Sequence, residues 1–232
     1  IVKHIVLALA ALLASLATLP AADSSLRADK KPNIVFILSD DAGIGDFSAY
    51  GCNYGVTPNI DRLAAEGMKF SRAYSGSAVC APSRCVLMTG QHTGHILRRS
   101  NQSKHGLLSL PAAQPTVARL LHDAGYATGG FGKWGLGNPG TTGVPENEGF
   151  DVFFGYYDQV HAHDYYTDHL VRNSVDVPYQ QSGKHTWEDY SHTRIANETL
   201  RFIEQNKDRP FFCYAAWTPP HADYVIPDNA PY

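Results

Sequence analysis

The stretch "NIVFILSDDAG" (residues 33–43) decides the fold. It joins a continuous apolar run, Ile34 to Leu38, to two aspartates and a glycine. A short run of Val, Ile and Phe that ends in turn residues is typical of a strand buried on both faces of a parallel sheet. We therefore expect such a strand here, with Asp40 and Asp41 at its carboxyl end.

Outward from this strand, helical and strand patterns alternate along the chain. Apolar spacing predicts helices in "TPNIDRLAAEG" (57–67), "PTVARLLHDAGY" (115–126) and "HTRIANETLRFIEQNKDRP" (192–210). Strands are expected in "MKFSRAYS" (68–75) and "FFCYAAW" (211–217), and a strand running into a glycine-rich loop in "ATGGFGKWGLG" (127–137). A long excursion over the sheet is expected in 141–181. This alternation indicates an α/β fold with a mainly parallel sheet flanked by helices on both faces.

Composition limits the kinds of partner. The 232 residues are 44% hydrophobic, which is enough for one sizeable core. The formal net charge of -3 gives no basic surface, so we expect no nucleic-acid partner. The four cysteines form no C-x-x-C metal pair, and they indicate a disulfide framework only weakly; they are Cys52, Cys80, Cys85 and Cys213.

The amino-terminal segment has the layout of a secretory signal peptide. Lys3 and His4 precede a mostly apolar run, Ile5 to Leu19, which is short for a membrane span of about 20 residues. We predict a signal peptide at 1–22 and a linker at 23–31, and an exported protein, periplasmic or secreted, with no stable membrane span after cleavage. The alternative is an uncleaved anchor helix or a lipoprotein segment.

Four loops at the expected carboxyl edge of the sheet hold unusual polar groups: the Asp40 and Asp41 loop, the Lys133 loop, "TPPHADY" with His221, and the Cys80 loop. Adjacent carboxylates such as Asp40 and Asp41 are costly to hold together unless a cation neutralises them, and oxygen ligands favour Ca²⁺ or Mg²⁺. A solvated turn is the alternative. In "CAPSR" (80–84), Cys80 is either a nucleophilic thiol beside Arg84 or a packed cysteine at the start of a helix.

"CAPSRCVLMTG" (80–90) matches the C-x-P-S-R-x-x-x-x-T-G pattern of the sulfatase family, which belongs to the alkaline-phosphatase-like superfamily. "NIVFILSDDAG", "TPNIDRLAAEG", "GKWGLG" and "PFFCYAAWTPPHADY" resemble other stretches of the family in the same order. The resemblance covers the chain from Pro32 to its end, so 32–232 is expected to be the amino-terminal part of a sulfatase catalytic domain. In this family the motif cysteine is oxidised to formylglycine (3-oxoalanine).

The resemblance implies a hydrolase of sulfate esters, arylsulfatase-like, that acts on a sulfated small molecule or a sulfated glycan. Cys80 would be converted by a formylglycine-generating enzyme, and one hydroxyl of the hydrated aldehyde would attack the sulfur. Asp40, Asp41 and the modified Cys80 would hold the metal, with Ca²⁺ favoured over Mg²⁺. Arg84 would orient the formylglycine, Lys133 would bind a sulfate oxygen, and His221 would donate a proton to the leaving group.

The chain departs from the family pattern at one site position. Many members have histidine two residues after the loop lysine, whereas this chain has Gly135, which cannot accept a proton. In "YDQVHAHDYYTDHL" (157–170), His161 and His163 are candidate replacement bases, with His163 preferred. The family's remaining metal ligands lie beyond His221 and are not assigned here, so we expect an amino-terminal fragment that is inactive by itself.

Two other functions remain open from the sequence. One is a phosphoester or phosphonate hydrolase, since members of the wider superfamily share the metal loop and some use formylglycine. The other is a non-catalytic glycan-binding relative. The intact cysteine motif and both aspartates disfavour the second, while Gly135 leaves it open.

Overall fold

The structure, a computed structural model, describes residues 31–101, 109–112 and 114–228. The chain divides into the units Ile1–Lys31 and Pro32–Tyr232, and every described helix and strand belongs to the second. The predicted signal peptide, and all of the predicted linker except Lys31, lie outside the described residues. Within the described ranges, no helix combines the length and the apolar character that crossing a membrane requires.

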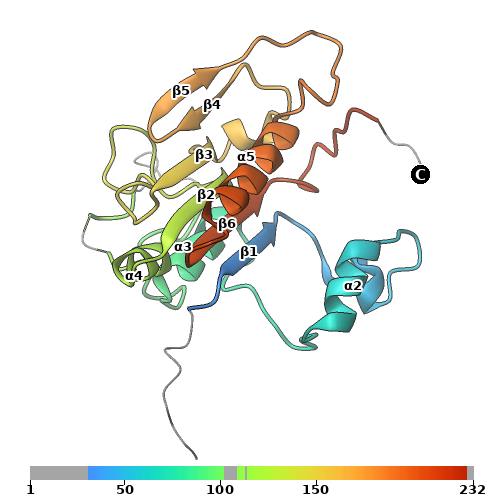
Figure 1. Cartoon of the computed structure of the whole chain (residues 1–232), viewed down its shortest axis with the longest axis horizontal. Helices are drawn as coiled ribbons and strands as arrows, with labels where there is room; N and C mark the ends of the chain where they lie inside the picture. Colours follow the sequence, from blue (N-terminus) through green and yellow to red (C-terminus); the bar gives the residue numbers. More distant parts are fainter. Residues whose placement is uncertain (1–30, 102–108, 113, 229–232) are drawn as a thin grey trace, which may run out of the picture. The chain divides into compact units, whose positions relative to one another are not determined.

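The described elements are strands, helices and short 3-10 turns (Figure 1). The strands are β1 (Ile34–Ser39), β2 (Ala127–Lys133), β3 (Val152–Tyr156), β4 (His169–Arg172), β5 (Val175–Pro178) and β6 (Phe211–Trp217). The helices are α2 (Pro58–Glu66), α3 (Cys80–Thr89), α4 (Val117–Asp123) and α5 (Ser191–Asn206), with short 3-10 turns η1 (Ile44–Asp46), η2 (Ser48–Tyr50) and η3 (His161–His163). Their order along the chain is β1, η1, η2, α2, α3, α4, β2, β3, η3, β4, β5, α5 and β6.

The six strands form one mixed sheet in the order β1-β6-β2-β3-β4-β5. The first four strands of this order are parallel, with Phe36 opposite Tyr214 and Phe131 opposite Ala215. The pairs β3–β4 and β4–β5 are antiparallel. Because β1, β6 and β2 run in one direction, their carboxyl ends meet at one edge of the sheet.

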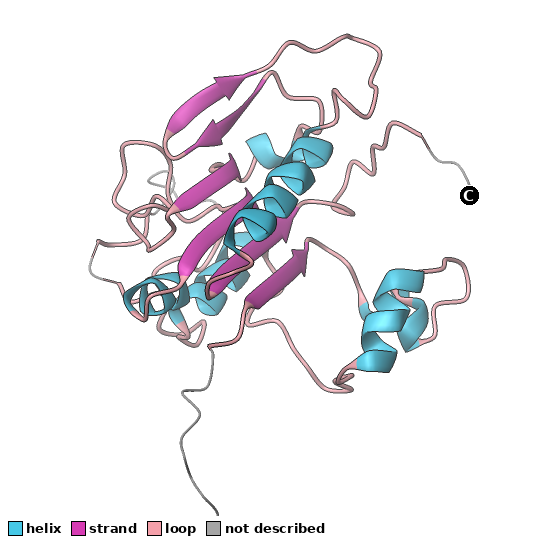
Figure 2. Ribbon diagram, viewed as in Figure 1, coloured by secondary structure: helices cyan, strands magenta, loops and turns pink. Residues whose placement is uncertain are grey.

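Helices cover both faces of the sheet centre, as the sequence predicts (Figure 2). On one face, Phe212 and Tyr214 of β6 pack into a cluster that includes Met88 of α3 and Ala118 of α4. On the other face, alternate residues of β6 and β2 pack against Phe202 of α5. Successive residues of a strand point to opposite faces, so one apolar run supplies both clusters.

The three predicted helices are confirmed as α2, α4 and α5, and three predicted strands as β1, β2 and β6. Helix α2 begins at Pro58 after Thr57 and is followed by Gly67, as its sequence suggests. None of its residues is buried, and Figure 1 shows it standing away from the sheet.

Three expectations need correction. Residues 68–75 form no strand, although they alternate in polarity. The segment 141–181 is not a plain excursion, because it contains β3, β4 and β5. Strand β1 is not buried on both faces: Val35 is 47% exposed and Ile37 is 55% exposed. Among the described residues β1 pairs with β6 alone, so it is an edge strand whose faces lack the cover that β6 has.

Candidate active site

Four elements bring the predicted site residues together. Asp40 follows β1, Lys133 is the last residue of β2, and His221 lies in the segment after β6, so all three stand at the carboxyl edge of the sheet. Cys80 is the first residue of α3, whose buried residues include Arg84. The parallel strands therefore supply the carboxylate, the lysine and the histidine, and the start of a helix supplies the cysteine.

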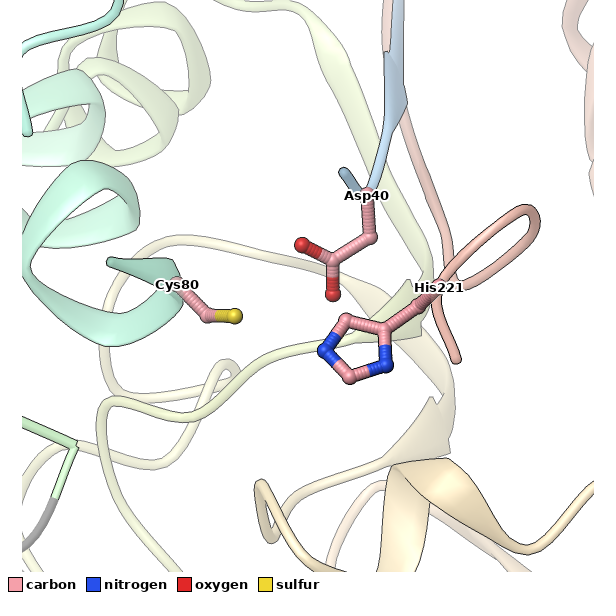
Figure 3. Close-up of side chains that lie close together, drawn as sticks. All are labelled: Asp40, Cys80 and His221. Atoms are coloured by element: carbon pink, nitrogen blue, oxygen red, sulfur yellow. The ribbon is translucent and has the colours of Figure 1, made fainter. Parts of the chain in front are cut away.

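The side chains of Asp40, Cys80 and His221 point toward one another (Figure 3). One carboxylate oxygen, the sulfur and one ring nitrogen all lie within 4.8 Å of one another. Asp40 and Cys80 line a cleft of about 300 Å³, together with Asp41 and Arg84. Residues separated by up to 181 positions in the sequence thus form one compact cluster.

Asp40 lies between two buried cations. Its Oδ2 accepts a hydrogen bond from Lys133 Nζ at 2.7 Å and lies 3.4 Å from Arg84 Nη2. Burial by itself would raise the pKa of Asp40, but the positive charges of Arg84 and Lys133 outweigh it and hold that pKa below its usual value of 3.8. Asp40 is therefore a carboxylate at neutral pH.

Arg84 is fixed by contacts on the far side of its guanidinium. Its Nη1 donates to the Lys133 carbonyl oxygen at 2.6 Å and lies 3.3 Å from the Tyr214 hydroxyl. Burial and the Asp40 charge raise the pKa of the Cys80 thiol, although Lys133 and Arg84 act in the opposite direction. The surroundings thus disfavour a thiolate at Cys80, which weakens the reading of this residue as a plain thiol nucleophile.

His221 faces Asp41 with a defined ring orientation. Its Nδ1 lies 2.7 Å from the carbonyl oxygen of Ala222, which only accepts, so Nδ1 carries a proton. Its Nε2 then remains for proton exchange and lies 3.3 Å from Asp41 Oδ2. The hydroxyl of the buried Tyr165 donates to the His221 carbonyl at 2.8 Å and holds this segment in place.

Of the two alternating histidines, only His163 lies in this cluster. Its ring stacks on that of His221 at 4.1 Å between centroids, and its Nε2 lies 3.3 Å from Lys133 Nζ. Burial and the neighbouring charges of Lys133 and His221 lower the pKa of His163, which favours the neutral ring. His161 instead contacts Thr167 Oγ1 at 2.7 Å and stacks on His169.

The cluster fits a divalent cation. Asp40 and Asp41 offer carboxylate oxygens, the ligands that hard cations prefer, and the Asp40 oxygen is close to residue 80. The Cys80 sulfur is a poor ligand for Ca²⁺, whereas an oxygen at that position suits it. Asp41 is the more exposed of the two aspartates and adopts a left-handed backbone conformation, with φ of 61°.

Sequence reasoning missed three residues that support the site. Tyr214 and Tyr165 hold Arg84 and His221, and Ser39 Oγ donates to the Pro219 carbonyl at 2.7 Å. The hydroxyl of Tyr214 is the one polar side-chain group in the apolar stretch "FFCYAA", which is a usable signal. Nothing comparable marks Ser39 or Tyr165, since their partners are distant in sequence.

Comparison with known proteins finds sulfatases among the relatives of this chain. An arylsulfatase of Hemicentrotus pulcherrimus is 35% identical over 226 residues, which cover 86% of this chain and 39% of the relative. An N-acetylglucosamine-6-O-sulfatase of Bacteroides thetaiotaomicron is 31% identical, and the match covers 92% of this chain and 35% of the relative. The chain thus spans well under half of these relatives.

Solved structures agree with the sequence comparisons. The crystal structure of Ps i-CgsB matches with a TM-score of 0.71 and 30% identity, over 83% of this chain and 46% of that one. The family model described as Sulfatase matches residues 32–232, which is everything after the first unit. The arrangement of Cys80, Asp40, Lys133 and His221 stands within that match, and the chain belongs to the sulfatase family.

Proposed function

We propose that the protein to which this chain belongs hydrolyses sulfate esters, with Cys80 converted to formylglycine and a divalent cation, Ca²⁺, bound beside it. The observation that carries the proposal is the convergence of Cys80, Asp40 and His221 within 4.8 Å, with Lys133 bonded to Asp40. Relatives named arylsulfatase and N-acetylglucosamine-6-O-sulfatase support the same reaction.

The proposed groups have separate tasks. Formylglycine would supply a nucleophilic hydroxyl, and the cation, held by Asp40, Asp41 and the oxygen of residue 80, would polarise the sulfate. Arg84 is buried and fixed by Lys133 and Tyr214, so it holds its positive charge beside residue 80 at little cost in reorganisation.

The two stacked histidines, His221 and His163, would transfer the protons. His221 has Nε2 available in a ring oriented by Ala222 and would donate to the leaving alcohol. His163 is favoured in its neutral form beside Lys133 and would accept a proton, in place of the side chain that Gly135 lacks. Lys133 would bind a sulfate oxygen with the ammonium that now contacts Asp40.

We propose a sulfated glycan as the substrate class, with a sulfated small molecule as the alternative. The N-acetylglucosamine-6-O-sulfatase relative, which aligns over 92% of this chain, supports the glycan. The maturing partner would be a formylglycine-generating enzyme.

Peptide mass spectrometry tests the proposal first. The full-length protein is expressed with a formylglycine-generating enzyme, and the tryptic peptide containing Cys80 is measured. Conversion lowers its mass by about 18 Da. A peptide that keeps the thiol mass, under conditions that convert a control sulfatase, contradicts the nucleophile proposed here.

Hydrolysis rates on matched substrates test the reaction type. We expect the full-length protein to cleave 4-nitrophenyl sulfate much faster than 4-nitrophenyl phosphate, and Cys80→Ser to lose turnover of both. A preference for the phosphate would instead assign the site to phosphoester hydrolysis. Chelation of divalent cations should abolish activity, and Ca²⁺ should restore it better than Mg²⁺.

A further inference from the structure

Gln159 is a buried side chain with unmet hydrogen-bonding capacity. It lies between β3 and η3 and is 4% exposed. Neither Nε2 nor Oε1 of its carboxamide has a hydrogen-bond partner within the described part of the chain. Leaving a buried polar atom unsatisfied costs about 1–3 kcal/mol, so a donor and an acceptor placed together in this way call for a functional explanation.

The carboxamide occupies space that a side chain at Gly135 would fill. A Cβ atom built on Gly135 would lie 1.4 Å from Gln159 Nε2, which is far inside any contact distance. The Gly135 backbone also has φ of 79°, a conformation that favours glycine, and its N–H donates to the Tyr157 carbonyl at 3.0 Å. The Gln159 carboxamide therefore occupies space that is free only because residue 135 is glycine.

This pair is close in the chain to two residues of the candidate active site. Gly135 is two residues beyond Lys133, whose ammonium contacts Asp40. Gln159 is four residues before His163, whose Nε2 lies 3.3 Å from the same ammonium. Burial alone is no ground for excluding Gln159 from a role in binding, because Lys133 of the cluster is itself 0% exposed.

The hydrogen-bonding chemistry of the Gln159 carboxamide limits which chemical groups could pair with it. A carboxamide donates through Nε2 and accepts through Oε1. A sulfate oxygen only accepts and would leave Oε1 unpaired, whereas a hydroxyl group both donates and accepts. We propose that Gln159 binds a hydroxyl group at this site. The absence of a side chain at Gly135 leaves room for its carboxamide beside the Lys133 loop. The hydroxyl belongs either to a sugar ring of the substrate or to a water molecule; the inference rests on the proposed function.

Three variants of the full-length protein test it. Gln159→Leu removes both hydrogen-bonding atoms at similar volume, and Gln159→Glu keeps acceptors only. Gln205→Leu, at an exposed position of α5, is the matched control. The temperature of unfolding is measured for each, and Gln159→Glu provides a second reading if Gln159→Leu fails to fold.

Binding is measured by calorimetry in a Cys80→Ser background, which removes turnover, and kcat/KM is measured in the Cys80 protein. The probes are N-acetylglucosamine 6-sulfate, which has free sugar hydroxyls, and 4-nitrophenyl sulfate, which has none. If the hydroxyl is the sugar's, Gln159→Leu weakens binding of the sugar sulfate about tenfold and leaves the aryl sulfate unchanged. If it is a water's, both probes lose by a similar factor.

The outcomes separate the two proposals. Binding that depends on Gln159 without any sulfate hydrolysis would overturn the proposed function and leave the hydroxyl contact standing. Unchanged binding and kcat/KM within twofold for folded Gln159 variants, or no binding of either probe to the Gln159 protein, would overturn the hydroxyl contact.

Discussion

Strands β1 and β6 are hydrogen-bonded neighbours with similar apolar sequences, yet they are buried to very different degrees. Every residue of β6 except Trp217 is buried, whereas Val35, Phe36 and Ile37 of β1 are exposed. The difference comes from position: β6 lies between β1 and β2 with helices on both faces, while β1 has one partner strand among the described residues. An apolar run thus predicts a strand, but its neighbours decide how much it stabilises the fold.

The candidate active site shows the same contrast. Lys133 and Arg84 are buried, and hydrogen bonds fix both side chains. Asp41 follows β1, and its side chain is 57% exposed. The two cations beside Asp40 are therefore held by buried contacts, whereas the side chain of Asp41 is largely exposed to solvent. Three predictions compare the buried sheet centre with more exposed parts of the molecule.

The largest expected effect is a loss of stability on Phe212→Ala. Phe212 is 3% exposed, and its ring stacks on that of Phe150 with 6.1 Å between the centroids. Its truncation should therefore cost about 3–5 kcal/mol in the free energy of unfolding. Phe36→Ala, in β1, should cost about 1–2 kcal/mol because Phe36 is 38% exposed. Urea unfolding measures both. Equal losses would mean that the faces of β1 are covered in the protein in solution.

An intermediate effect is expected from the pH dependence set by Glu148. Burial raises the pKa of Glu148 to about 7 from 4.5, and its side chain is 2% exposed. The folded state then holds a proton that the unfolded state has lost, so stability should fall as pH rises from about 4.5 to about 7 and level off above.

Glu148→Gln should remove that decline and stabilise the protein above pH 7 by about 2–3 kcal/mol. Thermal or urea unfolding at pH 5 and pH 8 measures the difference. Glu66→Gln, at an exposed position of α2, is the control for the removal of one carboxylate. If wild type and Glu148→Gln show the same pH profile, Glu148 is not held as the neutral acid.

The smallest effect concerns the orientation of His221. Tyr165→Phe removes the hydrogen bond to the His221 carbonyl, and it should lower kcat/KM about fivefold and the free energy of unfolding by about 1 kcal/mol. Tyr166→Phe removes a hydroxyl that bonds the His185 carbonyl instead, and its activity should stay at the wild-type level. A matching loss in both variants would show that the effect does not act through His221.

Particular residues show how far sequence reasoning reached. The start and end signals around α2, the apolar spacing of α5 and the runs in β2 and β6 are local, and those elements lie where predicted. The alternation in 68–75 is equally local but has no partner strand, so it forms none. The short strands β4 and β5 have weak patterns of their own, and they form because each pairs with a neighbour.

The sequence by itself determined the α/β fold class, the "CAPSR" motif and the set of polar residues expected at the carboxyl ends of the strands, because periodicity, turn residues and motifs are properties of neighbouring positions. Only the tertiary structure decided that His163 rather than His161 joins the cluster, and that Gln159 fills the space beside Gly135. These outcomes depend on which distant segments pack together, and that is set by burial across the whole sheet rather than by any local pattern.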